Sequence, residues 1–259
     1  STEKIADFLN ITGFTSTIST ACSSSANSLM LASRMLKSRK LDKVIAGGVD
    51  ALSLFTLNGF NSLMILDKEP CRSFDDSRAG LNLGEAAAFL VLERESSLKP
   101  DSKVYGFVSG FANANDAYHQ TASSPDGNGA GLAMQTALKM AQLHPSDIDY
   151  INAHGTATNN NDLSEGLAIM KVFVDQIPPV SSTKPFTGHT LAAAGAVEGV
   201  FSALALKHEV IYPNLNFKTQ MKELSFKPQT KLEHKRLRHI LSNSFGFGGN
   251  NSTIIYSKE

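Results

Sequence analysis

Cys22 stands where a strand pattern gives way to a helix pattern, a position at which a thiol can act as a nucleophile. The β-branched segment 15–21 predicts a strand, and the apolar residues of 23–38 recur at helical spacing. We expect the unpaired N–H groups at the start of this helix to favour the thiolate over the thiol. A lone cysteine is more often a buried structural residue, so both interpretations stay open for Cys22 alone. The other cysteine, Cys71, follows a proline in a loop, and we interpret it as structural.

Two histidines occupy similar junctions. His154 lies in 152–158 (NAHGTAT) at the end of a predicted strand, and His189 lies in 182–190 (STKPFTGHT) before a predicted helix. For either histidine alone, a structural role explains the sequence equally well. Because ligand sites of layered α/β proteins gather at strand ends, we expect Cys22, His154 and His189 to converge. The other histidines lack this setting and are predicted on the surface or in loops: His119, His144, His208, His234 and His239.

A glycine-rich turn in 243–250 (NSFGFGGN) joins the last two predicted strands. Gly246, Gly248 and Gly249 permit backbone conformations closed to other residues, so the turn can bring an N–H group close to a ligand. Phe247 would then cover the site. A plain tight β-turn explains the same residues equally well. A phosphate-binding loop is excluded, because the lysine and the Ser/Thr of that motif are absent.

The rest of the chain alternates strand and helix patterns, which favours one layered α/β unit. A long stretch of weak periodicity covers 51–76, and we interpret it as a functional excursion. We expect 86–93 and 103–112 to form neighbouring strands. The other predicted strands are 43–49, 149–153, 180–182, 238–242 and 252–257, and the other predicted helices are 131–143, 161–174 and 190–207.

Composition places these elements in a globular protein. Hydrophobic residues make up 42% and charged residues 19% of the 259 residues, which excludes disordered, collagenous and coiled-coil chains. The 24 basic residues balance the 24 acidic ones, so there is no global field of the kind that nucleic-acid and membrane-surface proteins carry. The longest apolar runs, such as 86–92, are far too short for a membrane span, and the polar start lacks a signal-peptide region. We therefore predict a cytoplasmic protein with reduced thiols.

Taken together, the motifs resemble the β-ketoacyl-[acyl-carrier-protein] synthases, the elongating condensing enzymes of the thiolase superfamily. The residues that carry the resemblance are TACSS at 20–24, NAHGTAT at 152–158, SSTKPFTGH at 181–189 with AAAGA at 192–196, and NSFGFGG at 243–249. Supporting matches are IAGG at 45–48, FDDSRAG at 74–80 and GEAAA at 84–88. These matches run in family order along nearly the whole chain.

The resemblance implies an α/β, thiolase-like layered αβαβα fold that is incomplete. Family members carry a further βαβαβ half before the nucleophile, where this chain has 21 residues. Residues 1–112 would then be the remainder of the N-terminal half with the nucleophile. Residues 113–259 would be the C-terminal half with both histidines, in one compact unit. Such a chain should expose a large apolar sheet face.

The resemblance also implies a reaction, decarboxylative Claisen condensation of an acyl thioester with malonyl-ACP in fatty acid or polyketide biosynthesis. Cys22 would take the acyl group, and the backbone N–H groups of Cys22 and Phe247 would form the oxyanion hole. His154 and His189 would bind the malonyl thioester and stabilise the enolate. No metal or redox cofactor is implied, since the 4′-phosphopantetheine arm belongs to the acyl carrier protein substrate.

Further residues take supporting roles by the same resemblance. Lys184 and Glu165 would form one network behind the histidine pair, because a buried lysine needs a partner. Thr156 and Thr158 would bind the pantetheine arm. Phe60 and Phe247 would be aromatic gates, although a plain core role explains Phe60 as well.

The chain departs from the family pattern at several positions. The triple serine 23–25 and the triple asparagine 159–161 replace other residues, and we expect these changes to touch the pocket and the pantetheine tunnel. Met64 stands where some members have an arginine that meets the carrier protein. A basic cluster at Lys231, Lys235, Arg236 and Arg238 could dock the carrier protein instead, or it could be a solvated charged face.

Two alternatives to a catalytic enzyme stay open. One is a non-catalytic partner subunit of the chain-length-factor type, which intact Cys22 disfavours, and the other is a fragment that binds a partner. The family works as homodimers or heterodimers of related synthase subunits, so we predict a dimer. The expected partner is acyl carrier protein, without nucleic acid and without a membrane span.

Overall fold

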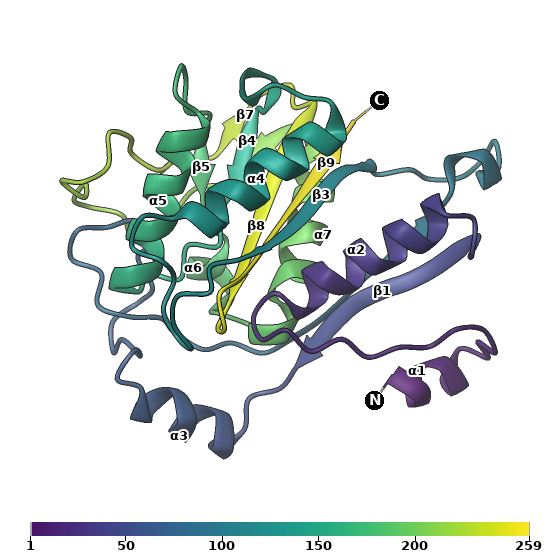
Figure 1. Cartoon of the computed structure of the whole chain (residues 1–259), viewed down its shortest axis with the longest axis horizontal. Helices are drawn as coiled ribbons and strands as arrows, with labels where there is room; N and C mark the ends of the chain where they lie inside the picture. Colours follow the sequence, from purple (N-terminus) through teal and green to yellow (C-terminus); the bar gives the residue numbers. More distant parts are fainter. Residues whose placement is uncertain (1, 259) are drawn as a thin grey trace.

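A five-stranded mixed sheet forms the centre of the protein in the computed structural model, which describes residues 2–258 (Figure 1). Its strand order is β3-β9-β8-β4-β5. The pairs β3–β9 and β9–β8 are antiparallel, whereas β8–β4 and β4–β5 are parallel. The strands are β3 (Phe107–Asn115), β4 (Tyr150–Asn152), β5 (Val180–Ser181), β8 (His239–Gly246) and β9 (Asn250–Ser257).

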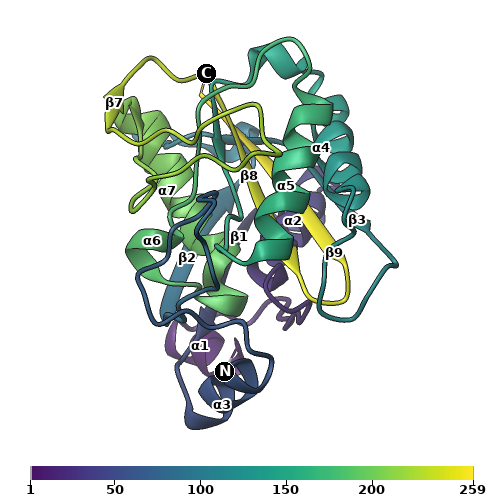
Figure 2. The same cartoon turned by 90° about the vertical axis from the view of Figure 1, so that its left-hand side faces the viewer.

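Helices cover both faces of this sheet. On one face α4 (Asn128–Ala141) packs on β3 and β9, with α5 (Asn159–Val172) beside it. On the other face lie α2 (Ser24–Lys37) and α7 (Ala194–His208), as the side view shows (Figure 2). The helix α2 was predicted from its helical spacing of apolar residues, and α7 was predicted as a helix of small residues.

A second sheet lies beyond α2 and α7. It pairs β1 (Lys43–Asp50) with β2 (Ala86–Glu93) in antiparallel register. The layers therefore run α, β, α, β, and the predicted layered α/β unit is confirmed with four layers among residues 2–258.

The remaining elements are α1 (Thr2–Phe8), α3 (Leu54–Ser62), α6 (Lys184–Thr187), the strand pair β6 (Val210–Ile211) and β7 (Glu233–His234), and the 3₁₀ turns Glu95–Ser97, Pro145–Asp147 and Leu191–Ala193.

The central sheet separates two hydrophobic cores. Successive residues of β9 alternate between them, since Ile255 faces α4 and α5 while Ile254 and Tyr256 face α2 and α7. On β8, Leu241 and Ile240 divide in the same way. Strands buried on both faces read as nearly continuous apolar runs, which is why 252–257 could be predicted as a strand.

The outer face of the β1–β2 pair is apolar and exposed. Ile45, Val49, Phe89 and Val91 share this face, and Val91 is 62% exposed. The inner face, with Ala46 and Leu90, packs on the second core. The expectation of an exposed apolar sheet face is thus confirmed for this strand pair.

Gly48 allows β1 to lie very close to the elements behind it. A Cβ atom at this position would come within 2.7 Å of the Ser25 Cβ atom and 2.8 Å of the Ala192 carbonyl oxygen. Ser25 is in the first turn of α2, and Ala192 lies just before α7. The absence of a side chain at Gly48 therefore sets the spacing between β1 and the starts of both helices.

Two expectations about the elements are wrong. Segment 15–21 is not a strand: it makes only an isolated bridge at Thr20, because no neighbouring strand lies beside it among the described residues. The segments 86–93 and 103–112 are not neighbours, since β2 pairs with β1 and β3 pairs with β9. The excursion 51–76 contains the helix α3, whose short amphipathic pattern is weak.

None of the helices in residues 2–258 combines the length and the apolar character that crossing a membrane requires.

We expect Met134→Ala to lower the free energy of unfolding by about 2–5 kcal/mol, because it leaves a cavity in the core between α4 and the sheet. Leu132→Ala, on the exposed side of the same helix, is the matched control and should change it by less than about 0.5 kcal/mol. Urea denaturation followed by circular dichroism measures both. Equal losses in the two variants would contradict the assignment of the α4 faces.

Candidate active site

The structure brings Cys22, His154 and His189 to one cavity of about 310 Å³. These three side chains come from the start of α2, the end of β4 and the segment after α6. The cavity is also lined by the other predicted site residues that face a ligand: Phe60, Thr156, Thr158 and Phe247. The expected convergence of the three residues is observed, but only His154 follows a strand, since Cys22 follows an irregular segment and His189 follows α6.

Cys22 is held at a sharp turn between Thr20 and α2. Ala21 has a left-handed backbone (φ 52°), which turns the chain directly into the helix that begins at Ser24. The backbone N–H groups of Phe247 and of Cys22 itself lie near the Cys22 sulfur, and both lower the pKa of the thiol. The thiol thus lies against the glycine-rich turn.

The expectation that Cys22 is a thiolate is wrong. Burial raises the pKa of its thiol to about 11, although the positive charge of Lys184 and the Phe247 N–H group both lower it. The cost of removing water from a charged sulfur is larger than the stabilisation that the N–H groups of the helix start and the turn provide. Cys22 is therefore a neutral thiol at pH 7, and negative charge on its sulfur has to form during a reaction. Burial likewise raises the pKa of the Cys71 thiol to about 11.

The triple serine after Cys22 anchors the start of α2 instead of lining the cavity. Ser23 Oγ donates to Asn250 Oδ1 (2.6 Å), and Ser24 Oγ donates to the Ala21 carbonyl (2.6 Å). Ser25 Oγ accepts from the backbone N–H of Ala196 on α7 (2.9 Å). None of the three lines the cavity, so the expectation that they touch the pocket is wrong.

His154 is oriented from behind by Lys184. The Lys184 Nζ atom lies 3.3 Å from His154 Nδ1, and an ammonium group can only donate. Nδ1 therefore accepts, so a neutral His154 carries its proton on Nε2. Burial, then the charge of Lys184 and then His189 hold the pKa of His154 well below its usual range.

His189 faces His154 edge-on, with ring centroids 5.3 Å apart and an interplanar angle of 86°. Its backbone N–H donates to the Asn82 carbonyl (2.7 Å), and its carbonyl accepts from Gly84 N–H (3.0 Å), so the 82–84 segment holds it in place. Burial and then the charge of Lys184 lower the pKa of His189 as well. Both histidines are thus neutral at pH 7.

The buried partner of Lys184 is Glu198, and the predicted network of Lys184 with Glu165 is wrong. Lys184 Nζ lies 2.5 Å from Glu198 Oε1, and both side chains are 2% exposed. Ser244 Oγ donates to the other oxygen of Glu198 (3.0 Å). Burial raises the pKa of Glu198, and the charge of Lys184 opposes that rise. Sequence reasoning missed Glu198, the one charged residue of an otherwise apolar stretch, 190–206.

Glu165 instead holds the backbone that carries His154. Its two oxygens accept from the backbone N–H groups of His154 (2.9 Å) and Gly155 (2.8 Å). Asn243 Nδ2 donates to it as well (3.0 Å). Burial raises the pKa of Glu165 to about 7 against these three donors. Glu165 therefore positions the loop after β4, without contacting Lys184.

Asp162 is a second buried carboxylate that sequence reasoning missed. It accepts from the backbone N–H groups of Phe74 (2.6 Å) and Ala157 (3.0 Å), and both of these residues have a left-handed backbone. Burial raises the pKa of Asp162. Its hydrogen bonds offset the strain of those two conformations, which bring the 156–158 segment into the cavity wall.

The mouth of the cavity is polar on one side and aromatic on the other. Thr156 Oγ1 and Thr158 Oγ1 lie 3.0 Å apart, and Thr158 also caps α5 by accepting from Asn161 N–H. All three residues of the triple asparagine 159–161 line the cavity, as expected. Across the mouth, the rings of Phe60 and Phe247 are stacked with centroids 6.0 Å apart. Met64, in the same wall, is 88% exposed.

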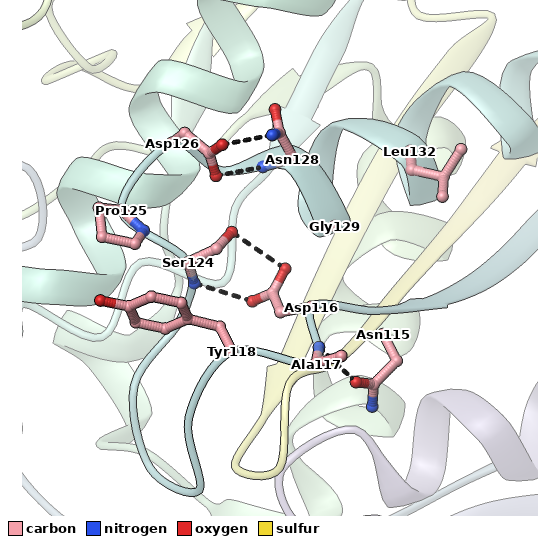
Figure 3. Close-up of a pocket in the computed structure, with 10 residues that line it drawn as sticks. All are labelled: Asn115, Asp116, Ala117, Tyr118, Ser124, Pro125, Asp126, Asn128, Gly129 and Leu132. Carbon is pink, nitrogen blue, oxygen red and sulfur yellow. Dashed lines mark hydrogen bonds between the residues drawn. The ribbon is translucent and has the colours of Figure 1, made fainter.

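A larger open cavity of about 540 Å³ lies beside β3 and the start of α4 (Figure 3). Its carboxylates already serve their own loops, since Asp116 accepts from Ser124 and Asp126 accepts from Asn128. It contains no cysteine or histidine. Across residues 2–258, the histidine, cysteine and carboxylate side chains form no group of three or more that could hold a metal ion.

Comparison with known families matches both parts of the chain. Residues 3–97 match the profile "Beta-ketoacyl synthase, N-terminal domain", and residues 105–218 match "Beta-ketoacyl synthase, C-terminal domain". Among curated proteins, the chain is 37% identical to the putative mitochondrial 3-oxoacyl-[acyl-carrier-protein] synthase of Schizosaccharomyces pombe. That match covers 95% of this chain and 62% of the relative. This chain is also 36% identical to 3-oxoacyl-[acyl-carrier-protein] synthase 2 of Staphylococcus aureus, over 92% of this chain and 60% of that relative.

Solved structures match over the whole chain. A type II polyketide synthase acyl-carrier protein in complex with its ketosynthase gives a TM-score of 0.95 at 29% identity, covering 100% of this chain and 66% of that one. A ketosynthase in complex with its chain length factor from Xenorhabdus doucetiae gives 0.92 at 36% identity, covering 100% and 63%. The chain thus spans less than two thirds of the length of these relatives.

The raised pKa of Cys22 predicts slow alkylation by iodoacetamide at pH 7, with a rate that still rises about tenfold per pH unit up to pH 10. Mass spectrometry of the peptide that contains Cys22 gives the rate. The Cys22→Ala variant is the control for reaction at Cys71. A rate that levels off below pH 9 would show that the thiolate is favoured after all.

The Lys184–Glu198 pair predicts that substitutions at these two positions have strongly non-additive effects on the free energy of unfolding. Lys184→Met should lower the free energy of unfolding by about 3–5 kcal/mol, because it leaves a buried carboxylate without its cation. Lys184→Met/Glu198→Gln should recover at least half of that loss, since no charge then stays buried and the new amide oxygen can still accept from Ser244. Denaturant titration of the single and double variants tests this cycle, and additive losses would argue against the pair.

Proposed function

Because the chain belongs to the β-ketoacyl synthase family, we propose that it acts as a 3-oxoacyl-[acyl-carrier-protein] synthase. This acyltransferase would join an acyl thioester to malonyl-ACP with loss of carbon dioxide, in fatty acid or polyketide biosynthesis. One observation carries the proposal: a buried cysteine with a backbone N–H group on its sulfur shares one cavity with two histidines of lowered basicity.

The first step transfers the acyl group to Cys22. The sulfur attacks the thioester carbonyl, and the backbone N–H groups of Cys22 and Phe247 stabilise the oxyanion that forms. Collapse of this intermediate releases the pantetheine thiol, which leaves with the proton that Cys22 gives up. Since the pKa of Cys22 is about 11, charge builds up only while those N–H groups can stabilise it.

The second step forms the carbon–carbon bond. His154 donates from Nε2 to the carbonyl oxygen of the malonyl thioester, because Lys184 occupies its Nδ1. The His189 ring lies edge-on against the His154 ring, and it donates a second hydrogen bond to the same carbonyl oxygen. Loss of carbon dioxide leaves an enolate, whose carbon attacks the acyl-Cys22 carbonyl. The C–S bond then breaks, and Cys22 regains a proton from solvent as the 3-oxoacyl product departs.

The cavity mouth supports roles for the remaining predicted residues. Thr156 and Thr158 line it with two hydroxyl groups, which suits hydrogen bonding to the amides of a pantetheine arm. The stacked Phe60 and Phe247 rings lie where the acyl chain and the extender would pass, and we assign them as gates. Lys184, Glu198 and Glu165 do not line the cavity, so we assign them to the support of the two histidines.

We propose acyl carrier protein as the substrate carrier and a dimer, with a second copy or a related synthase subunit, as the working form. Two matched structures are described as complexes of a ketosynthase, one with its acyl-carrier protein and one with its chain length factor. A non-catalytic subunit of the chain-length-factor type would not need Cys22, and Cys22 is present in a reactive setting. The cytoplasmic location stays a prediction, since the matched relatives include bacterial proteins and proteins named mitochondrial.

Incubation with acyl carrier proteins of several chain lengths should add one acyl group to the protein by intact mass, and Cys22→Ala should abolish the adduct. Cys71→Ala is the matched control, because Cys71 is equally buried and has the same raised pKa. It should retain the adduct. A folded protein that takes no acyl group from any donor would overturn the proposed function.

A further inference from the structure

Three asparagines from three elements meet beside the nucleophile turn without lining the active-site cavity. They are Asn27 on α2, Asn113 on β3 and Asn250 at the start of β9. The reaction described above uses none of them. We propose that these three residues are positioning residues that fix the separation of the two oxyanion-hole N–H groups, an inference that rests on the proposed function.

The side-chain oxygen of Asn250 is the centre of the cluster. Three donors lie within hydrogen-bond distance of it: Ser23 Oγ at 2.6 Å, Asn113 Nδ2 at 2.8 Å and Asn27 Nδ2 at 3.0 Å. The Ser23 hydroxyl shares its one proton between Asn250 and the Thr20 carbonyl, which is 2.7 Å away. Asn250 Nδ2 donates back to Asn113 Oδ1 (3.2 Å), and Asn113 Nδ2 is also within reach of Asn27 Oδ1 (3.0 Å). Each asparagine thus contacts both of the others.

The cluster joins the two segments that supply the oxyanion hole. Ser23 directly follows Cys22, so its bond to Asn250 fixes the start of α2 against β9. Asn250 pairs with Gly246 in the β8–β9 register, and Phe247 is the first residue of the turn between them. A Cβ atom on Gly246 would lie 3.2 Å from the Cys22 nitrogen, so the two segments are in direct contact here.

Backbone bonds alone do not fix this contact. Segment 15–21 is not paired in a sheet, and Cys22 follows a residue with a left-handed backbone. Side-chain bonds must therefore hold the turn that carries the nucleophile. An oxyanion hole works only when its donors are within about 2.7–3.1 Å of the oxyanion, so a small change in spacing weakens both bonds.

Other contacts to the turn act at different atoms. Asn115 Nδ2 donates to the Gly248 carbonyl, and Asp116 N–H donates to the Gly249 carbonyl. These bonds hold the turn to the end of β3 but do not reach α2. Among the described side chains around the turn, Asn250 connects it with the Cys22 segment through Ser23 and Asn27.

The test compares two reactions of the same sulfur. Acyl transfer from an acyl-ACP forms an oxyanion, whereas alkylation by iodoacetamide does not. In Asn250→Ala, we expect acyl transfer to Cys22 to slow by about 10- to 100-fold, less than the loss of a whole oxyanion-hole donor. The alkylation rate should fall by much less than the acylation rate, because alkylation forms no oxyanion and burial, the largest influence on the pKa of Cys22, is unchanged.

Asn113→Ala provides a second variant at an exposed position, where misfolding is less of a risk. It should slow acyl transfer in the same direction, and Asn113→Ala/Asn250→Ala should be no slower than Asn250→Ala alone, since both act through one cluster. Asn128→Ala is the matched control. Asn128 is an exposed asparagine whose side chain bonds to Asp126 and Lys171 and not to the Cys22 segment, so its substitution should change neither rate.

The outcomes separate this inference from the proposed function. If the wild-type protein takes no acyl group, the proposed function fails and this inference fails with it. If the wild-type protein is acylated and Asn250→Ala is acylated equally fast, only the positioning role is overturned. Equal slowing of acylation and alkylation would also overturn it, because that pattern reports a general disturbance of Cys22.

Discussion

The buried charge of Lys184 is the constraint on which the active site depends. An ammonium group without water is tolerated only beside an anion, and Glu198 on α7 supplies that anion. This requirement fixes α7 against the end of the 182–187 segment, close to the central sheet. Burial and then the same charge lower the pKa of both histidines, and the Lys184 ammonium group also donates to Nδ1 of His154. One ion pair therefore links the packing of the middle helix layer to the chemistry of the cavity.

Burial, more than local dipoles, sets the protonation states around this pair. The thiol of Cys22 lies near a helix start, a backbone N–H group and a lysine, and it is still a neutral group. The carboxyl groups of Glu165, Glu198 and Asp162 are likewise less acidic than usual, despite several hydrogen bonds each. A site of this kind holds little charge at rest. Its hydrogen-bond donors are available for charge that develops during a reaction, which is the arrangement that favours a transition state over a ground state.

Sequence reasoning predicted what periodicity and motifs express directly. The helices α2, α4, α5 and α7 and the strand β2 were predicted close to their observed bounds, since each has a regular apolar pattern. The convergence of Cys22, His154 and His189 was predicted from their expected places at strand ends, although in the structure only His154 follows a strand. The failures have a common cause: a strand at 15–21 needs a neighbour, and the pKa of Cys22 depends on burial. Neither property is visible in local sequence. Glu198 was missed because a helix of small apolar residues suggests only packing, and the resemblance pointed to another carboxylate, Glu165, eleven residues after His154.

The close approach at Gly48 gives β1 a mechanical part in the site. One side of this strand pair faces outward with Ile45 and Val91, and the other touches Ser25 and the Ala192 carbonyl through the bare Gly48 backbone. Close-packed interiors transmit displacement, because no free volume absorbs it. A displacement of the outer face would therefore reach, through the thickness of a single strand, the starts of α2 and α7, which follow Cys22 and His189 in the chain.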